Sequence, residues 1–533
     1  FKSMDLNRVI KLFEDPFSVS YQYYINYVWL LLLYYHRLFY PLKDLSQIIQ
    51  ILNLCAERIE DHKDFVDPMC EIVKLCGLPF LKEKTSDELN YAQVVAESIS
   101  QLGCMMRVPS SQVRIQLCRA LINFYNPDPV IQQVEGFQPT AVNYKVQMAE
   151  AGGLAETLIL SMTLVENQLR EKLSLLKVLQ LLSSSPENCK LMAKAQGANS
   201  ICYRLSDPDP SGQLLFRSSE ILWNLLENGP KEEIINQLSN TECIYALKDS
   251  FVRLLTNGYK HYDRQLRNDL LVIATLIAEN SVPPLILFSD GKVMLALFNY
   301  VKANEKPGKH DWPAARFEDL QLHAIATLST VAPLLLEDYM TCQGNTRILL
   351  FLEWCASQDT YFGQGNCFHG TGGRGNKHAQ MRYCLRLLRS VVSIGDETVN
   401  QDLCDQGAIN QFLGILGKIV NGSAENEDAT LLEIQTDILF ILSTLCENDL
   451  HRKDLFGSEG VDVLLQLLRM NHSKYYSGLG HNKLIFCTLD CVWCCVIGCF
   501  SSEDYFLEKE GMFIILDLLA KKYTSNAFFL KMH

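Results

Sequence analysis

The sequence predicts an all-α protein in which helical repeats stack into an α-solenoid. Apolar residues recur at helical spacing along almost the whole chain, as in the stripe formed by Ile221, Leu222, Leu225 and Leu226. Stretches in which apolar and polar residues alternate, which are typical of strands, are rare. Glycine (29) and proline (17) are scarce in a chain of 533 residues, which disfavours a loop-rich all-β protein. Because 48% of the residues are apolar and 20% are charged, the chain can form a sizeable core.

A phrase that returns along the chain predicts how these helices are arranged. It consists of a large apolar residue, a short polar step, a glycine and an amphipathic helix. The copies are MAEAGGLAETLI (148–159), MAKAQGANSICYRL (192–205), LFSDGKVMLALF (287–298), LCDQGAINQFLGIL (403–416), LFGSEGVDVLLQLL (455–468) and FLEKEGMFIILDLL (506–519), with weaker copies around Thr241 and Gly344. Self-similarity of this kind indicates a repeat architecture, in which no unit buries its apolar face alone.

The spacing of the phrase favours an armadillo/HEAT-like unit. Its marker residues are Gly153, Gly197, Thr241, Gly291, Gly344, Gly407, Gly460 and Gly511, at intervals of 44 to 63 residues. Armadillo and HEAT units run about 40–47 residues, so the longer intervals carry loop insertions. A glycine supplies the backbone freedom that a tight turn between helices needs. Because this glycine precedes the final helix, we expect armadillo rather than HEAT repeats, stacked into a right-handed superhelix.

A second phrase precedes several of the markers and supports the same repeat. It is an apolar helix that closes on Glu-Asn, and its copies are ILWNLLEN (221–228), IATLIAEN (273–280) and ILSTLCEN (441–448). Each repeat is therefore expected to combine one such helix with the helices that flank the glycine.

No long linker divides the chain, so we expect one array. Residues 1–144 are interpreted as an N-terminal helical region with irregular repeats, and residues 145–533 as an armadillo-like array with a glycine-rich loop insertion at 363–376. The most apolar stretch, YVWLLLLYY (27–35), is shorter than the roughly 20 residues that a membrane span requires. We therefore interpret it as a buried helix and expect no membrane segment.

Charge and cysteine content exclude several classes of partner. Lysine and arginine number 48 and aspartate and glutamate 61, for a formal net charge of −13, so we expect no nucleic acid and no anionic membrane among the partners. The 19 cysteines lie mostly in apolar helical runs, where a free cysteine behaves as a small buried hydrophobe. A reducing intracellular compartment is therefore expected.

Two segments resemble cofactor or metal motifs without meeting their requirements. GTGGRG (370–375) matches G-x-G-x-x-G, but it follows a helix and a polar loop instead of a strand, so nucleotide binding is not expected. CTLDCVWCCVIGCF (487–500) holds five cysteines, yet it lacks the second ligand pair of a zinc site, so we expect core packing. No catalytic signature is present. A catalytic triad is formed in space and has no fixed order in sequence, but a stacked repeat array is not expected to hold one. We therefore expect no catalytic residue, no cofactor and no metal.

Basic residues gather directly after the glycine-rich loop and form the candidate partner-binding site. They are Arg374, Lys377, Arg382, Arg386 and Arg389, and the last three share one helical face. On an acidic chain this stripe is suited to an acidic peptide or the acidic face of a partner. The alternative is a solvated face whose arginines pair with neighbouring acidic residues.

Six long phrases resemble one known family. They are MDLNRVIKL (4–12), DPDPSGQLLFRSSEILWNLLE (207–227), HYDRQLRND (261–269), LQLHAIATLS (320–329), FHGTGGRGNK (368–377) and SEDYFLEKEG (502–511). They are similar to an armadillo-type family of cilia- and flagella-associated proteins. The sequence departs from that family in the aromatic segment 17–40, in a short step from Asn280 to Leu285, as though a repeat were missing, and in the segment KKYTSNAFFLKMH (521–533).

The resemblance implies a non-enzymatic scaffold in the axoneme of motile cilia and sperm flagella. It places the protein in a projection of the central apparatus, where it supports flagellar assembly and ciliary beating. Its partners would be other projection proteins, and the central-pair microtubule would be reached mostly indirectly. The alternative function is a soluble armadillo adaptor that binds peptides in cytoplasm or nucleus.

Overall fold

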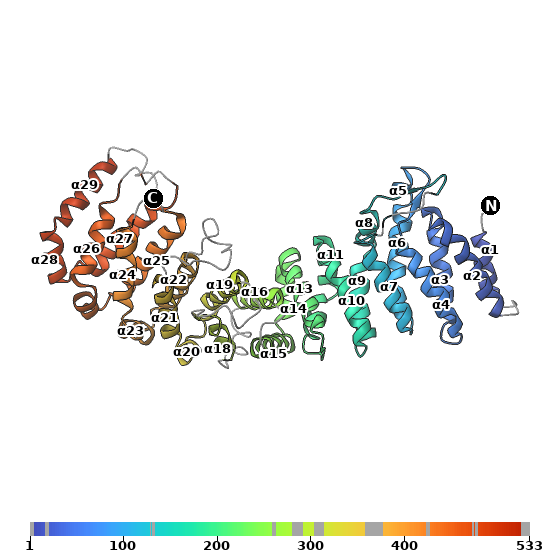
Figure 1. The fold of residues 1–533 in the computed structure, drawn as a ribbon, viewed down its shortest axis with the longest axis horizontal. Helices are drawn as coiled ribbons and strands as arrows, with labels where there is room; N and C mark the ends of the chain where they lie inside the picture. The colour runs from blue at the N-terminus through green and yellow to red at the C-terminus, as the bar shows by residue number, and fades with distance from the viewer. Residues whose placement is uncertain are drawn as a thin grey trace. The chain divides into compact units, whose positions relative to one another are not determined.

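The computed structural model describes residues 5–15, 21–127, 129, 134–257, 263–279, 292–302, 314–357, 377–422, 427–471, 474 and 478–523. The chain divides into two compact units, residues 1–250 and residues 251–533, and each unit is described by itself (Figure 1). In both units the described residues are predominantly helical, which confirms the predicted all-α class.

Unit 1 contains the helices that precede the division, with helix α15 (Thr241–Asn257) spanning it. They are α1 (Leu6–Glu14), α2 (Tyr21–Leu38), α3 (Leu45–Arg58), α4 (Val66–Cys76), α5 (Asp87–Asn90), α6 (Ala92–Gly103), α7 (Ser111–Asn123), α8 (Tyr144–Ala151), α9 (Leu154–Leu160), α10 (Leu169–Leu182), α11 (Pro186–Lys194), α12 (Gly197–Cys202), α13 (Gln213–Asn228) and α14 (Lys231–Leu238). Short 3-10 helices lie at η1 (Leu42–Asp44), η2 (Lys63–Phe65), η3 (Cys104–Arg107) and η4 (Ser161–Val165). Strands β1 (Leu81–Lys82) and β2 (Gln138–Pro139) form one antiparallel pair, with Leu81 opposite Pro139.

Unit 2 continues the same alternation of long and short helices. Its helices are α16 (Asp263–Glu279), α18 (Lys292–Phe298), α19 (Ala314–Val331), α20 (Leu336–Thr341), α21 (Gly344–Ser357), α22 (His378–Val392), α23 (Glu397–Asp405), α24 (Ala408–Val420), α25 (Ala429–Leu445), α26 (Gly457–Leu468), α27 (His481–Cys495), α28 (Phe500–Glu508) and α29 (Gly511–Tyr523). A single π-helical turn, η8 (His451–Phe456), takes the place of the short helix before α26.

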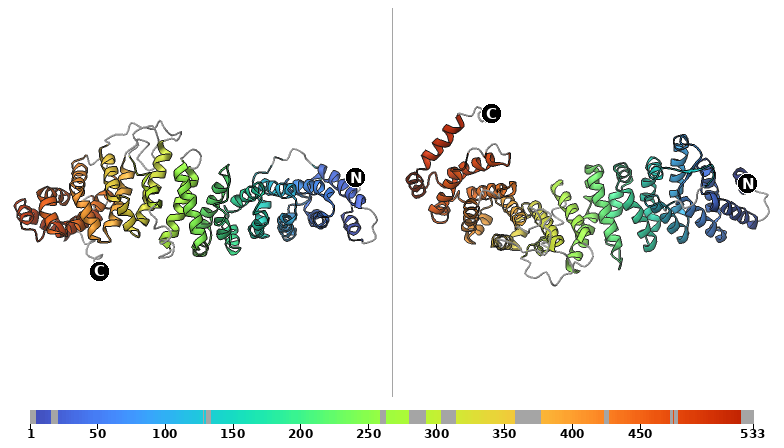
Figure 2. Two further views of the ribbon diagram at one scale, coloured as in Figure 1. Left: turned by 90° about the horizontal axis from the view of Figure 1, so that it is seen from below. Right: turned by 45° about the horizontal axis from the view of Figure 1, so that its top comes forward.

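One helix of each repeat packs on the same helix of the next repeat and builds a ladder. In unit 1 the ladder runs through α4, α7, α10 and α13, and in unit 2 through α16, α19, α22, α25 and α27 (Figures 1 and 2). The predicted stripe on α13 forms its buried face, because Ile221, Leu222 and Leu225 are all buried. Of the two Glu-Asn phrases whose residues are all described, ILWNLLEN ends with α13 at Asn228, and ILSTLCEN ends three residues after Leu445, the last residue of α25. The predicted repeat is therefore confirmed as the unit that stacks.

Two of the ladder helices, α7 and α25, begin at residues whose side chains satisfy free backbone N–H groups. Asp428 caps α25 by accepting a hydrogen bond from the backbone N–H of Leu431 at 2.8 Å, and Ser110 caps α7 in the same way through Val113. Ser185 caps the short helix α11, which carries Pro186 at its first position. The cap at Ser185 separates the short helix α11 from the long helix α10 before it.

The marker glycines have two different physical reasons. Gly153 and Gly407 adopt left-handed φ angles of 73° and 81°, as the backbone-freedom argument predicts. At Gly344 and Gly511 the left-handed residue is instead the preceding one, Gln343 or Glu510. Gly197 likewise follows a left-handed residue, Gln196, and Gly460 lies within helix α26. The prediction that the marker glycine supplies backbone freedom is therefore wrong at these four positions.

Lack of space explains the other glycines. A Cβ atom at Gly344 would lie 2.3 Å from the ring of Tyr339, and one at Gly511 would lie 2.5 Å from the ring of Phe506. In each case an aromatic residue of the short helix fills the place where a side chain would stand. The aromatic ring therefore packs directly against the backbone of the glycine, and this contact requires a residue without a side chain at that position.

The N-terminal region joins the array without marker glycines. Helix α6 packs on α3, α8 and α9, and α7 packs on both α4 and α10, so the predicted boundary at residue 144 lies within a continuous row of contacts. That division of the chain stays a prediction. The predicted insertion at 363–376 lies outside the described residues.

The apolar stretch near the N-terminus is a partly buried helix. In α2 the side chains of Val28, Leu31, Leu32 and Tyr35 are buried, whereas Trp29, Leu30 and Leu33 are 40%, 52% and 64% exposed, so the predicted buried helix is buried on one face only. Over the described part of the chain, no single helix combines the length and apolar character of a membrane span. One sharply bent pair, 144–151 with 154–165, meets those criteria by length and composition alone.

Candidate interaction sites

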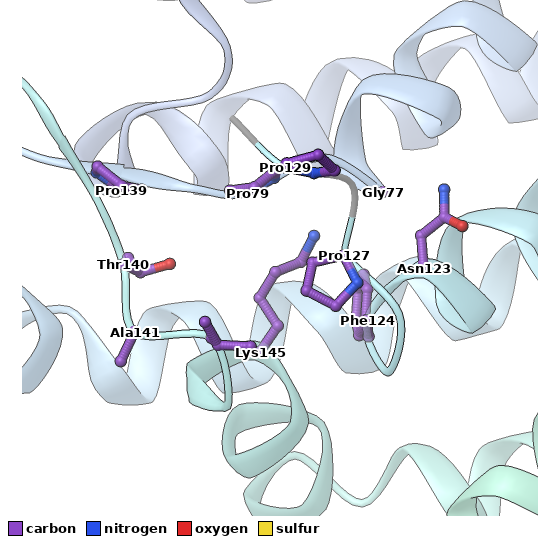
Figure 3. A pocket seen from close by; sticks show the side chains of 11 residues that line it. Gly77, Pro79, Asn123, Phe124, Pro127, Pro129, Pro139, Thr140, Ala141 and Lys145 are labelled. Atoms are coloured by element: carbon purple, nitrogen blue, oxygen red, sulfur yellow. The ribbon is translucent and has the colours of Figure 1, made fainter. Parts of the chain in front are cut away.

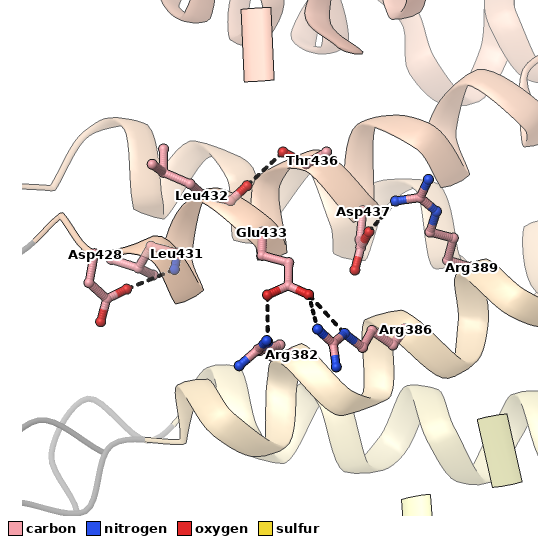
Figure 4. A network of polar contacts seen from close by, with 9 residues as sticks. All are labelled: Arg382, Arg386, Arg389, Asp428, Leu431, Leu432, Glu433, Thr436 and Asp437. Atoms are coloured by element: carbon pink, nitrogen blue, oxygen red, sulfur yellow. Dashed lines mark hydrogen bonds and ion pairs between the residues drawn. The ribbon is translucent and has the colours of Figure 1, made fainter. Parts of the chain in front are cut away.

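The predicted basic stripe lies on the ladder helix α22. Arg382, Arg386 and Arg389 project from α22 toward the neighbouring ladder helix α25, as Figure 4 shows. Lys377 precedes the helix and is buried, with its ammonium 4.2 Å from the centre of the Trp354 ring. Arg374 lies outside the described residues. The structure thus brings together the three arginines that sequence spacing placed on one face.

Each of these three guanidinium groups meets a carboxylate of α25. Arg382 Nε lies 2.6 Å from Glu433 Oε2, and Arg386 donates from Nε to Glu433 Oε1 at 2.8 Å. Arg389 donates from Nη1 to Asp437 Oδ1 at 2.6 Å, and its guanidinium also lies over the ring of Phe440 at 4.4 Å. These contacts agree with the alternative interpretation of the sequence, in which the arginines pair with neighbouring acidic residues. Partner binding by the stripe stays a prediction.

The two carboxylates differ in burial, and the arginines outnumber them. Asp437 is only 5% exposed, and burial raises its pKa above the ordinary value although the nearby charge of Arg389 acts in the opposite direction. Arg382 and Arg386 share the single carboxylate of Glu433. The stripe therefore joins two consecutive repeats, and its three arginines exceed the two carboxylates that they contact by one positive charge. The most exposed of the three is Arg386, at 43%.

A pocket in unit 1 was not predicted from the sequence. It has a volume of about 210 Å³ and lies where the ends of α4 and α7 meet the segment that leads into α8 (Figure 3). Its lining residues are Gly77, Pro79, Asn123, Phe124, Pro127, Pro129, Pro139, Thr140, Ala141, Val142 and Lys145. Four of them are prolines, so much of the wall consists of rigid apolar rings that donate no backbone hydrogen bond.

Lys145 forms the polar floor of this pocket. Its side chain is buried, and Nζ donates to the backbone carbonyls of Cys76 at 2.6 Å and Leu78 at 2.7 Å, at the end of α4. The ammonium also lies over the rings of Phe80 and Phe124, at 4.4 and 4.2 Å. Burial lowers the pKa of Lys145 to about 7. The residue thus carries a proton that is only weakly held near neutral pH.

Sequence reasoning missed Lys145 because its helix has no clear polarity pattern. Helix α8 is only eight residues long, and Lys145 stands in its first turn. The available signal was the cluster of Pro127, Pro129 and Pro139 just before the helix, which marks an irregular turn. That signal predicts a loop, but it does not predict that these prolines and Lys145 line one pocket.

The cysteine-rich segment packs into the core only in part, because Cys487, Cys494 and Cys499 are half-buried and Trp493 is 70% exposed. Cys491 and Cys495 of α27 are buried with their Sγ atoms 3.5 Å apart. Hydrogen bonds to Cys446 and Cys491, together with burial, raise the pKa of Cys495 well above its ordinary value, so its thiol stays protonated. Among the described residues, no group of three or more His, Cys, Asp and Glu side chains is placed to hold a metal ion. GTGGRG (370–375) lies outside those residues.

The stacked ladder helices, with paired short helices around a tight turn, define an armadillo-repeat protein. A solved structure from work on the phosphorylation switch that controls the interaction between cadherin and β-catenin has the same fold, with a TM-score of 0.53 at 11% identity. That comparison covers 91% of this chain and 81% of the other. The family is then defined by sequence. The model for the ARM repeat of cilia- and flagella-associated protein 69 matches residues 4–287 and 284–528, so the chain belongs to this family.

Curated relatives agree with this assignment. The chain is 53% identical to human cilia- and flagella-associated protein 69 over 578 residues, and 51% identical to the mouse protein over the same length. Each alignment covers 98% of this chain and 61% of the relative, so the chain spans about three fifths of the relatives' length. Because 578 exceeds the 533 residues of this chain, the relatives hold positions that this chain lacks. The two matches to the family model overlap at residues 284–287. This overlap lies at the end of the step from Asn280 to Leu285 that the sequence analysis describes as short.

Proposed function

We propose that the protein is a non-enzymatic scaffold of the axoneme, located in a projection of the central apparatus of motile cilia and sperm flagella. The observation that supports the proposal is the family match over nearly the whole chain, combined with ladders of stacked helices in both units. Stacked repeats hold a fixed surface against several partners at once, because each repeat contacts mainly its neighbours. In this function the protein contributes geometry to flagellar assembly and ciliary beating, and its partners are the other proteins of the projection.

The central-pair microtubule is reached mainly through those partners. The chain carries a net charge of −13, and the tails of tubulin are also acidic, so direct contact over a broad surface is opposed by like charges.

The experiment is to locate the tagged protein in demembranated axonemes. We expect it to remain with the microtubules after detergent extraction, and its removal to delete density from a central-apparatus projection in maps of intact axonemes. Loss of density from the outer doublets instead, or complete release by detergent, would contradict the proposal. Complete release is the result expected of the alternative, a soluble peptide-binding adaptor of cytoplasm or nucleus.

We also propose that the excess positive charge of the α22 stripe contacts an acidic face of one partner. The test is Arg386→Gln, which removes one of the two arginines that share Glu433 while Arg382 continues to pair with that carboxylate. We expect the variant to fold normally and to lose one partner from the complex that co-purifies with the wild type. Lys418→Gln on helix α24, at an exposed position, is the matched control for a lost surface charge. An unchanged complex would leave the stripe with only its structural contacts.

A further inference from the structure

Two buried cysteines meet between consecutive repeats of unit 1. Cys202 is the last residue of α12, which begins at the marker Gly197, and Cys243 lies in the first turn of α15, which begins at the marker Thr241. Both side chains are fully buried. The Cys202 thiol donates to the backbone carbonyl of Cys243 at 3.4 Å, and the two thiols are also hydrogen-bonded to each other. The pair therefore bridges one repeat and the next.

The position of Cys243 favours the thiolate form of its side chain. Asn240 stands directly before α15 and accepts from the backbone N–H of Cys243 at 2.8 Å, so the thiol lies at the N-terminus of a 17-residue helix. A helix N-terminus stabilises a negative charge. The hydrogen bond from Cys202, together with one from the Asn240 side chain, lowers the pKa of Cys243 below its ordinary value, although burial acts in the opposite direction. Because the thiolate is the reactive form of cysteine, Cys243 is the nucleophilic member of the pair.

Other buried cysteines of the fold have the opposite character. Cys189 on α11 is equally buried, its thiol donates to backbone carbonyls, and burial raises its pKa to about 11. Cys491 and Cys495 also touch each other, at 3.5 Å, yet hydrogen bonds to Cys446 and Cys491 raise the pKa of Cys495 well above its ordinary value. Contact between two thiols is therefore combined with a stabilised thiolate at the pair between α12 and α15.

Both sulfur atoms lie close to the protein surface. Tyr203, the residue after Cys202, is 48% exposed. Thr241 and Glu242, which precede Cys243, are exposed as well. Helix α12 is only six residues long, and short surface elements open locally at a small cost in free energy. Such openings give a molecule as small as hydrogen peroxide access to the pair.

We propose that Cys202 and Cys243 form an oxidative modification site, at which hydrogen peroxide converts the two thiols into a disulfide. The Cys243 thiolate attacks one oxygen of the peroxide, so that an S–O bond forms, the O–O bond breaks, and the leaving hydroxide takes a proton and departs as water. Cys202 then loses its proton and attacks the sulfur of this sulfenic acid; the S–S bond forms, the S–O bond breaks, and a second water leaves. The two sulfurs lose two electrons, and the peroxide gains them.

The disulfide ties two consecutive repeats together. It joins residues 41 positions apart and fixes the end of α12 against the start of α15. A cross-link of this kind stabilises the folded protein by restricting the unfolded chain. In a reducing compartment the link is transient, as disulfides in redox-sensing proteins of the cytosol are. Oxidation therefore holds this step of the array closed until the disulfide is reduced.

The experiment treats the whole reduced chain with hydrogen peroxide, blocks the remaining thiols and digests the monomeric fraction with trypsin. The sequence places Cys202 as the single cysteine of tryptic peptide 195–204 and Cys243 as that of peptide 232–248. We expect these two peptides to be joined after oxidation and separated by dithiothreitol. We also expect oxidation to raise Tm, and dithiothreitol to reverse the rise. Absence of the joined peptide would overturn the proposal, and an unchanged Tm in the oxidised protein would overturn the link between repeats.

A second thiol contact in the same sample is the internal control. Cys446 lies in tryptic peptide 419–452 and Cys495 in peptide 484–509. We expect these two peptides to stay separate at a peroxide concentration that joins the peptides of the proposed site, because the Cys495 thiol stays protonated. Joining of both pairs at the same rate would contradict the assignment of Cys243 as a stabilised nucleophile.

Variants separate the roles of the two cysteines. In Cys202→Ala the sulfenic acid of Cys243 has no thiol to attack it, so dimedone, which traps sulfenic acids, should label peptide 232–248. In Cys243→Ala, peptide 195–204 should stay unlabelled. Cys189→Ala removes an equally buried thiol from α11 and should form the joined peptide as the wild type does. Label on Cys202 in Cys243→Ala, or none on Cys243 in Cys202→Ala, would contradict the assigned roles, and the wild-type peptides decide the site itself without any variant.

Discussion

Single side chains decide which positions of the repeat accept substitution, and the glycines show this most clearly. At Gly344 a Cβ atom would meet the ring of Tyr339, whereas at Gly414, an exposed position inside α24, nothing lies within 4 Å. We expect Gly344→Ala to destabilise the protein by about 1–3 kcal/mol through overpacking. Gly414→Ala should stabilise it by roughly 0.5–1 kcal/mol, because alanine favours the helix. Urea unfolding of the two variants measures both; a Gly344→Ala variant as stable as wild type would contradict the steric account.

The protonation of Lys145 makes a second prediction at the scale of one residue. Burial lowers its pKa to about 7 in the folded protein, whereas an unfolded lysine has a pKa near 10.4. Between these values the unfolded chain binds more protons, so stability from this group rises with pH. Relative to Lys145→Met, we therefore expect the wild type to gain stability between about pH 7 and pH 10. The difference in urea midpoint at pH 6.5 and pH 9 measures this gain; a difference that falls with rising pH would show that the assigned shift is wrong.

At the scale of elements, ion pairs join consecutive ladder helices. Arg389 on α22 pairs with the buried Asp437 on α25. The substitution Arg389→Met would leave the buried carboxylate of Asp437 without this partner. We expect this variant to lose about 1–3 kcal/mol of stability. Asp437→Asn should cost less, because Arg389 is 35% exposed and water can solvate it.

A double-mutant cycle isolates the pair. The combined variant Arg389→Met and Asp437→Asn should be more stable than the sum of the two single losses indicates. The reason is that the combined variant removes both charges of the pair, so that no buried charge is left without its partner. Additive losses, measured by the same unfolding curves, would show that the two side chains do not interact across the repeats.

At the scale of the whole molecule, the net charge determines whether the chain binds a microtubule directly. With a net charge of −13, the purified chain should not sediment with microtubules on its own at physiological ionic strength. Sedimentation should appear only when projection proteins are added. Binding of the isolated chain that weakens steeply with salt would instead point to a local basic contact, and Arg386→Gln would show whether that contact is the α22 stripe.

Sequence reasoning reached the helices, the repeat and the family because these depend on local information. Helical spacing of apolar residues reports the face that must be buried, and a repeat multiplies that signal along the chain. The positions of Arg382, Arg386 and Arg389 on one face also follow from helix geometry alone. The acidic residues that pair with these arginines could not be predicted in this way. Glu433 lies 47 residues after Arg386, and Asp437 lies 48 residues after Arg389.

Only the tertiary structure decided which charges are satisfied and which glycines are crowded. The reason for Gly344 is the ring of Tyr339, and the reason for Gly153 is a left-handed backbone, although both stand in the same phrase. Lys145 became a buried cation because α8 packs against the end of α4, and nothing in its own helix announces that contact. Sequence by itself thus determined the array and its net charge, since periodicity and composition are properties of the chain. The contact of Lys145 with the carbonyl groups at the end of α4 arose from packing between segments that lie almost 70 residues apart.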